Sequence, residues 1–184
     1  MIRRATKNDI AEVARLMLAL WPHQSVEEMH SEAEKSIARP DQAVFLCIEG
    51  RPCGFAICSI RRDWVEGSST SPVGYLEGIY VADDSRRKGI ARGLLSACQA
   101  WAVEQGCSEF ASDCEAENAD SEAFHLHCGF RVASRIVCFI KPAMEGQAAA
   151  SPKQERLPSV SSPRDPKKGW VSPGAGMKME DPDL

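Results

Sequence analysis

A basic stretch that contains a glycine follows an apolar run near the middle of the chain. Residues 75–92 read YLEGIYVADDSRRKGIAR, and Arg86–Ala91 has the pattern R-x-x-G-x-A. The apolar residues predict a strand that ends at Val81, and the residues from Gly89 onward predict an amphipathic helix. The first N–H groups of a helix lack intrahelical partners and carry partial positive charge, so they stabilise an anion. The stretch therefore predicts a diphosphate-binding loop.

The residue types in this loop suit a phosphate ligand. Gly89 has no Cβ and lets the backbone approach a phosphate closely. Basic side chains at a helix N-terminus oppose the helix dipole unless an anion covers them. The alternative is a surface helix with a basic N-terminus and no ligand. The residues assigned to the ligand are Arg86, Arg87, Lys88, Gly89, Ile90, Ala91 and Arg92.

The elements that must position this loop alternate between strand and helix patterns. Residues 49–52 (EGRP) predict a hairpin turn, and residues 67–72 (GSSTSP) predict a flexible loop. The order of elements is that of an α/β fold with a mixed sheet. Asn8 or Asp9 is expected to cap the first helix. Strands are predicted at 2–5, 43–48, 54–60, 75–81, 109–112 and 136–140, and helices at 10–20, 25–38, 89–105 and 119–127.

The overall composition excludes several classes of protein. The chain has 184 residues, of which 22 are Lys or Arg and 26 are Asp or Glu. One domain is expected at this length, and an acidic balance does not suit a nucleic-acid-binding protein. No apolar run reaches the roughly 18 residues of a membrane span. The N-terminus, MIRRATKNDI, lacks the apolar core of a signal peptide, so we expect a cytoplasmic protein.

Eight cysteines are spread along the chain, and none forms a C-x-x-C pair. Several occupy apolar positions of predicted strands and helices. We interpret them as buried or free thiols in a reducing compartment, and we expect no metal site. A catalytic cysteine is a minor alternative.

The composition changes near Glu145. Residues 145–184 hold six of the eleven prolines and no cysteine, and their six basic and six acidic residues cancel. This segment cannot bury enough apolar surface to fold by itself. The sequence therefore predicts a folded domain at 1–144 and a largely disordered tail at 145–184.

The strand–loop–helix segment resembles the GNAT superfamily of acyl-CoA-dependent N-acetyltransferases, as does the later segment from Asn118 to Gly129-Phe130. The resemblance covers most of residues 1–144. It implies a central, mostly antiparallel sheet flanked by helices, with acetyl-CoA as co-substrate. Within the superfamily, the runs SPVGYLEGIYV, RRKGIA and EFASD resemble the aminoglycoside 6′-N-acetyltransferases.

The narrower resemblance implies a polycationic sugar as substrate. Such a ligand needs carboxylates to pair with its ammonium groups and an aromatic face against its rings. The relatives carry Tyr where this chain has Trp64, and an acidic residue where it has Ser134, which would alter the range of drugs accepted. The substrate-binding positions that the resemblance implies are Trp21, Trp64, Glu77 and Asp113. His23 and Gln24 follow Trp21 and could reach the same rim, and Ser134 would be a substrate contact without a charge.

The reaction implied is direct attack of an amine on the acetyl-CoA thioester. Glu77 or Asp113 is the candidate general base, directly or through water, although carboxylates also hold an ammonium in its charged form. His125 stands where many relatives carry the Tyr that protonates the leaving thiolate. The family also places CoA contacts at Asn118, which can instead cap a helix. The thioester oxygen would meet a backbone N–H within Ile79, Tyr80 and Val81.

Other readings stay open at this stage. The enzyme could acetylate a polyamine, an amino acid or a protein amine, or the chain could be a non-catalytic acyl-CoA sensor. Trp21 could be a core residue at a helix end, Trp64 a surface residue and Asp113 a simple cap. The acidic run 115–120 is more often a solvated face than a set of contacts. Related enzymes dimerise through C-terminal strands, so we expect a homodimer with an interface at 132–140.

Overall fold

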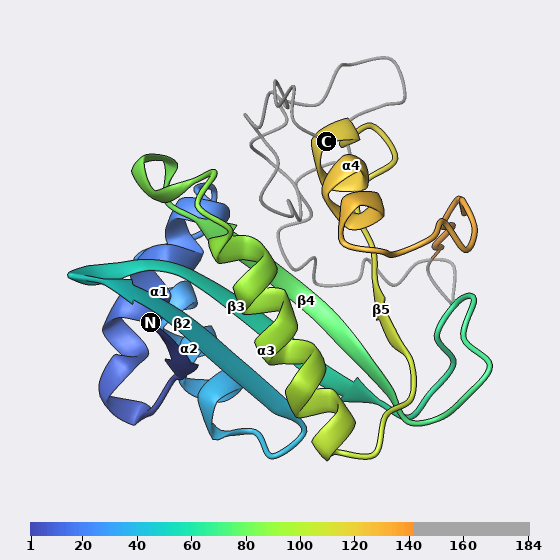
Figure 1. Ribbon diagram of the computed structural model, residues 1–184, viewed down its shortest axis with the longest axis horizontal. Coiled ribbons are helices and arrows are strands. Elements are labelled where there is room, and N and C mark those ends of the chain that lie inside the picture. The colour runs from blue at the N-terminus through green and yellow to red at the C-terminus, as the bar shows by residue number, and fades with distance from the viewer. Residues whose placement is uncertain (142–184) are drawn as a thin grey trace.

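The computed structural model describes residues 1–141, so the predicted tail at 145–184 lies outside the described residues. Five strands form one sheet in the order β1-β2-β3-β4-β5 (Figure 1). Two short 3-10 turns, η1 (Lys7–Asp9) and η2 (Asp83–Ser85), precede α1 and α3. The strands are β1 (Ile2–Arg4), β2 (Gln42–Glu49), β3 (Arg51–Arg61), β4 (Val73–Val81) and β5 (Phe110–Ser112). The helices are α1 (Ile10–Leu20), α2 (Val26–Ala38), α3 (Ile90–Glu104) and α4 (Ala119–His127).

Strands β1 to β4 pair antiparallel, and β5 joins β4 in parallel. The predicted α/β fold with a mostly antiparallel mixed sheet is therefore confirmed. The parallel pairing is short, because it covers only Gly74–Leu76 of β4. Beyond Leu76, the described part of the chain places no strand beside β4 on its β5 side. Strands β4 and β5 therefore separate after Leu76.

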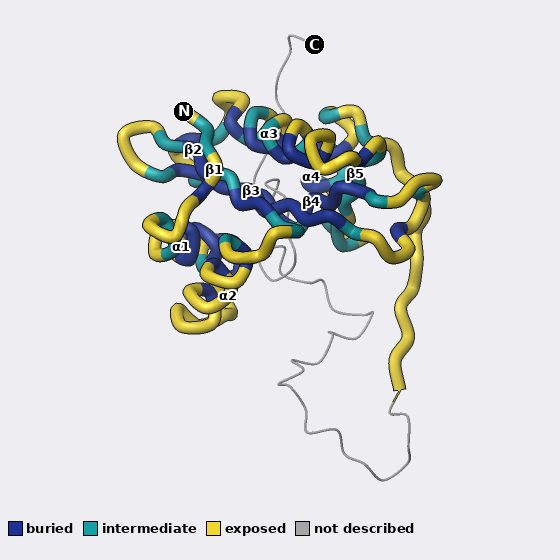
Figure 2. The backbone as a smooth tube through the Cα atoms, turned by 90° about the horizontal axis from the view of Figure 1, so that it is seen from below, coloured by how far each residue is buried: buried dark blue, intermediate teal, exposed yellow. Residues whose placement is uncertain are grey.

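Helices cover both faces of the sheet. Helices α1 and α2 pack on one face and α3 on the other, so the sheet lies between two helical layers (Figure 2). Residues of β3 alternate between the two layers, as a regular strand requires. Phe55 and Ile57 belong to the core under α1 and α2, whereas Ala56 and Cys58 belong to the core under α3.

Strand β4 breaks this alternation at Glu77. Leu76 and Ile79 both belong to the core under α3, although residues three apart point to opposite faces of a regular strand. The pairing with β3 explains this, because Ile57 faces Gly78 and Cys58 faces Leu76, which leaves Glu77 as an extra residue. This is a β-bulge, which re-aims the side chains around it.

The N-terminal caps of the helices agree only in part with those expected from the sequence. Ser25 and Glu28 form a capping box at the start of α2, and the side chain of Asn118 accepts from the N–H of Ser121 at the start of α4. Asp9 is the residue before α1, but its carboxylate does not cap that helix. It accepts instead from the backbone of Thr6 and from the guanidinium of Arg3.

The predicted strand at 136–140 is wrong. Residues 131–141 have no regular secondary structure and are exposed. A strand needs a neighbour to satisfy its backbone, and β5, three residues long, offers little edge for pairing. The large apolar side chains that remain exposed in this segment are Val132, Ile136, Val137, Phe139 and Ile140.

All eight cysteines lie within residues 1–141 and are free thiols, as predicted. Five of them are buried. None of the helices described by the structure is long and apolar enough to cross a membrane.

Candidate active site

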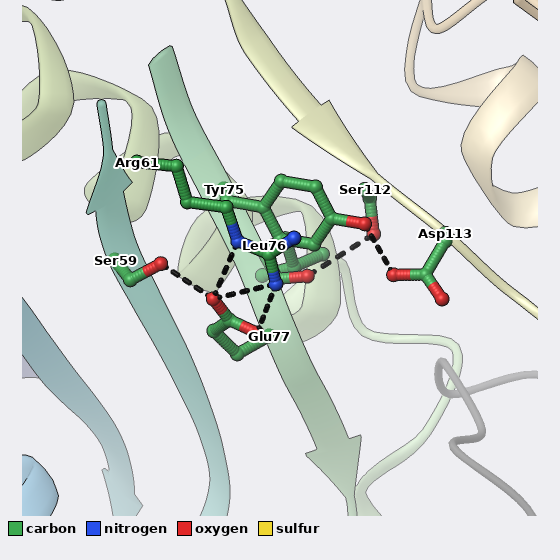
Figure 3. Close-up of polar contacts among 7 residues, drawn as sticks. All are labelled: Ser59, Arg61, Tyr75, Leu76, Glu77, Ser112 and Asp113. Atoms are coloured by element: carbon green, nitrogen blue, oxygen red, sulfur yellow. Dashed lines mark hydrogen bonds and ion pairs between the residues drawn. The ribbon is translucent and has the colours of Figure 1, made fainter. Parts of the chain in front are cut away.

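The carboxylate of Glu77 is held by side chains from the neighbouring strand (Figure 3). Arg61, the last residue of β3, donates from Nη2 to Oε2 at 2.8 Å and to Oε1 at 3.0 Å, and from Nε to Oε1 at 3.1 Å. The hydroxyl of Ser59 also donates to Oε1. A carboxylate in an apolar strand needs such partners, and the side chain of Glu77 is only 18% exposed.

Tyr75 connects this pair to Asp113 (Figure 3). The guanidinium carbon of Arg61 lies 3.3 Å from the centre of the Tyr75 ring, and the Tyr75 hydroxyl donates to Oδ1 of Asp113. Burial and the hydrogen bond to Asp113 raise the pKa of Tyr75, so the phenol stays protonated. Ser112, beside Asp113, donates to the carbonyl oxygen of Leu76 at 3.2 Å, which holds the end of β5 against β4.

A cleft of about 920 Å³ opens between the α1–α2 side of the sheet and the loop after β3. It brings together five of the predicted substrate residues, Trp21, His23, Gln24, Trp64 and Glu77. Trp21 is buried and lies edge-on to Phe55, with the ring centres 6.3 Å apart, whereas Trp64 is 80% exposed. The structure does not bring Asp113 or Ser134 into the lining. Both are exposed, and Asp113 reaches the cleft only through Tyr75 and Arg61.

Acidic residues outnumber basic ones around the cleft. The acidic lining residues are Glu32, Asp41, Asp63, Glu77 and Glu115, and the basic ones are Arg39, Arg61 and Arg62. The excess of carboxylates favours a cationic ligand. The arginines already occupy some of these carboxylates, since Arg39 pairs with Asp41 and Arg61 with Glu77.

Residues 82–89 join β4 to α3, and the basic stretch Arg86–Arg92 covers the end of this connection and the first turn of the helix. Arg86 turns back toward the protein, donating from Nε to the carbonyl oxygen of Val81 at 3.1 Å and pairing with Asp83 at 2.8 Å. Arg87 and Gly89 both have positive φ, 59° and 72°. Turns of this kind gather successive N–H groups into an anion-binding concavity. Exposed basic side chains surround it, those of Arg87, Lys88 and Arg92.

The N-terminus of α3 is open toward solvent. Gly89 is the residue before the helix, and a Cβ built on it would meet no atom within 4 Å. Its conformation favours glycine, and the space beside it is open. The N–H groups of Ile90, Ala91 and Arg92 belong to the first turn of α3 and have no intrahelical acceptor. These features fit a diphosphate.

The two predicted residues of α4 have structural contacts. Nδ1 of His125 lies 2.7 Å from the carbonyl oxygen of Ser121, and its ring is edge-on to Phe124 and Phe130. Burial lowers the pKa of His125, so the imidazole is neutral near pH 7 with its hydrogen on Nδ1. Nε2 then carries a lone pair. Proton donation by His125 stays a prediction that this geometry does not favour, and Asn118 is the cap of α4.

Glu109 anchors the loop that carries Trp64. Its carboxylate accepts from the backbone N–H groups of Ser69 and Thr70, at 2.8 and 2.7 Å, and from both hydroxyls. The hydroxyl bond of Thr70 and the other hydrogen bonds lower the pKa of Glu109 to about 2. On the same loop, Gly67 lies against Ala133, beside Ser134.

Sequence reasoning missed Ser59, Arg61, Tyr75 and Glu109. One signal pointed to the first two: a carboxylate inside an apolar strand requires a donor nearby. Ser59 and Arg61 are two residues apart, so they share a face of β3. The strand that supplies them follows from the pairing of β3 with β4, which the sequence pattern does not specify.

Fold and site together define an N-acetyltransferase that uses an acyl-CoA. The profile of the Acetyltransferase (GNAT) family matches residues 9–130, and the chain belongs to this family. The superfamily predicted from the R-x-x-G-x-A loop is confirmed.

Individual proteins similar to this chain carry a more specific name than the family. Over 143 residues the chain is 42% identical to the aminoglycoside N(6′)-acetyltransferase type 1 of Stenotrophomonas maltophilia, covering 77% of this chain and 92% of that protein. Over 128 residues it is 41% identical to the enzyme of the same name from Serratia marcescens, covering 68% and 88%. The solved structure of AAC(6′)-Iy with the bisubstrate analog CoA-S-monomethyl-acetylneamine has a TM-score of 0.74 and 34% identity, covering 77% and 97%.

Gly89→Ala should weaken CoA binding. The new Cβ would occupy the open space beside the first turn of α3 and strain a backbone with φ of 72°. We expect the dissociation constant for CoA, measured by calorimetry, to rise by about tenfold or more.

Gly106→Ala is the matched control. Gly106 also has positive φ and open space beside it, but it lies beyond the other end of α3. It should carry the same backbone strain, about 1–2 kcal/mol, and leave CoA affinity unchanged. Equal losses of affinity in both variants would show that strain, rather than the phosphate contact, explains the effect.

The Glu109 carboxyl should titrate far below an ordinary glutamate. Its pKa is lowered in the folded state, so the anchored loop is fully stabilised above the unfolded-state pKa of about 4.3. The stabilisation is lost as pH falls toward about 2. In NMR spectra, the amide signals of Ser69 and Thr70 should stay unchanged between pH 6 and 4. A shift of these signals with a midpoint near pH 4.3 would contradict the anchor.

Proposed function

We propose that this protein transfers the acetyl group of acetyl-CoA to the 6′-amine of aminoglycoside antibiotics and thereby confers resistance to them. One observation carries this proposal. A cleft with an excess of carboxylates opens on β4 at Glu77, and the same strand leads into a phosphate-binding loop four residues after it ends. One strand, β4, thus connects the proposed site of the cationic amine substrate with the proposed site of the anionic acetyl donor. The names of the relatives identify the cation as an aminoglycoside.

Acetyl-CoA enters the reaction as co-substrate and supplies the activated acetyl group. The loop at 86–92 would hold its diphosphate by the N–H groups of Ile90, Ala91 and Arg92 and by the exposed basic side chains. The part of β4 beyond Leu76 lies where the sheet parts. Its backbone groups on that side need polar partners, and we assign them to the amide-bearing arm of CoA. An N–H within Ile79–Val81 would meet the thioester oxygen.

Trp21, Trp64 and Glu77 would receive the sugar, with His23 and Gln24 on the same rim. Glu77 is held in place by Ser59 and Arg61 and would accept an ammonium group of the substrate. Asp113 has one oxygen bound by Tyr75. Its second oxygen accepts no hydrogen bond from any side chain that the structure describes, so Asp113 has more room than Glu77 to accept the amine proton, although it lies outside the lining of the cleft. Ser134, the uncharged substrate contact expected from the sequence, lies outside the lining of the cleft.

We also infer a cytoplasmic homodimer. Five large apolar side chains between Val132 and Ile140 are exposed in the single chain. Burying them against a second copy would remove a surface that soluble proteins rarely leave open. The family's C-terminal pairing offers the expected partner for this segment.

Release of CoA thiol in the presence of different acceptors tests the proposed function. We expect turnover with kanamycin and tobramycin, and none with a relative that carries a hydroxyl in place of the 6′-amine. Equal turnover with all three would place the reaction on another amine. Turnover with spermidine alone would favour a polyamine acetyltransferase. CoA binding without turnover on any amine would favour a sensor.

A further inference from the structure

Arg61 is a cation inside a cleft that should attract cations. Its guanidinium lies on the Tyr75 ring and donates three of the four hydrogen bonds that the structure gives Glu77 (Figure 3). The side chains of Arg61 and Glu77 are 40% and 18% exposed, so water screens the pair only in part. A positive charge at this place opposes the binding of an ammonium group. Its presence therefore calls for a role that outweighs this repulsion.

The hydrogen bonds limit what Glu77 can do. Oε1 accepts from Ser59 and twice from Arg61, whereas Oε2 accepts once. A proton transferred to Oε1 would have to displace one of these donors. Oε2 keeps room for one further donor, in a direction that the guanidinium fork fixes. Glu77 is thus arranged to accept a hydrogen bond from an ammonium at Oε2, while Oε1 is occupied by its three donors.

Arg61 also influences the position of Asp113, through the side chain of Tyr75. The Tyr75 ring lies under the guanidinium, and the Tyr75 hydroxyl binds Asp113. Glu77 lies in β4 and Asp113 directly follows β5, and these two strands stop pairing after Leu76. Arg61 and Tyr75 bridge that gap through side chains.

We propose that Arg61 is a positioning residue that fixes the carboxylates of Glu77 and Asp113 relative to each other, and so sets the rate at which the bound amine is acetylated. The inference rests on the proposed function. Removal of the Arg61 guanidinium should change substrate binding and reaction rate in opposite directions. Removing the guanidinium makes the cleft more acidic, which favours binding of a polycation, but releases both carboxylates, which slows the reaction.

Arg61→Gln and Arg61→Lys test the proposal through steady-state kinetics with tobramycin. In Arg61→Gln, kcat should fall about 10- to 100-fold, since a misplacement of about 1 Å has this effect, while KM for tobramycin stays equal or falls. Arg61→Lys keeps the charge but loses the fork and the stacking, so its kcat should fall as well. A kcat within about twofold of wild type in either variant would overturn the proposal.

Arg39→Gln is the matched control. Arg39 lines the same cleft and forms the same kind of fork, with bonds of 2.9 and 2.7 Å to Asp41, but it makes no contact with Glu77. The loss of one positive charge from the cleft should change KM for tobramycin in both Arg39→Gln and Arg61→Gln, whereas the fall in kcat should be much smaller in Arg39→Gln. A fall equal to that in Arg61→Gln would show that the total charge of the cleft controls the rate, and would also overturn the proposal.

Two further measurements make the result decisive. CoA affinity should match wild type in each variant, and circular dichroism should show that each variant is folded at the assay temperature, which separates positioning from loss of fold. The thermal midpoint of Arg61→Gln should fall, because Glu77 loses its guanidinium partner. If Arg61→Gln does not fold, Tyr75→Phe replaces it, because it removes only the hydroxyl that holds Asp113. Its kcat should fall, and an unchanged kcat would contradict the bridge. Wild-type turnover itself decides the proposed function, whereas the ratio of variant to wild type decides the role of Arg61.

Discussion

The parting of β4 from β5 is the constraint on which the rest of this structure depends. A continuous sheet would satisfy the backbone of residues 77–81 on both sides and leave no place for a ligand between the strands. The pairing of β5 with Gly74–Leu76 ends where the bulge at Glu77 begins. The bulge turns the Glu77 side chain to the cleft face while Ile79 and Val81 return to the core under α3. Strand β4 then ends at the basic loop before α3. The acidic part of the site therefore depends on one local irregularity, and the same strand continues toward the basic stretch at 86–92.

This arrangement places a carboxylate in an otherwise apolar strand, which is unfavourable unless donors surround it. Ser59 and Arg61 supply them from β3, and their place on one face follows from the strand period. The same guanidinium stacks on Tyr75, whose hydroxyl reaches the end of β5. A single residue thus compensates the burial of Glu77 and spans the opening in the sheet. Glu109 plays a comparable part nearby, where its carboxylate binds the loop that carries Trp64.

Features encoded in adjacent residues could be predicted from the sequence. The loop at 86–92, the helix α3 and the strand β4 depend on residues near one another in the chain, and the structure contains all three. The partner of Glu77 could not be predicted, because it depends on the register between β3 and β4 and on a bulge that no pattern marks. The strand expected at 136–140 has strong β propensity, yet propensity alone does not form a strand without a neighbouring edge. The link from Asp113 to Glu77 through Tyr75 and Arg61 could not be predicted either, and the role of Asp113 toward the substrate stays a prediction.

The position of the new amide bond tests most directly whether the protein acetylates the 6′-amine. In kanamycin the 6′-amine is attached to a methylene carbon, and the other amines are attached to ring methine carbons. The product formed from acetyl-CoA labelled with ¹³C at the acetyl carbonyl can be examined by long-range carbon–proton NMR. We predict a correlation from the labelled carbonyl to the 6′ methylene protons. A correlation to a ring methine proton instead would contradict the account.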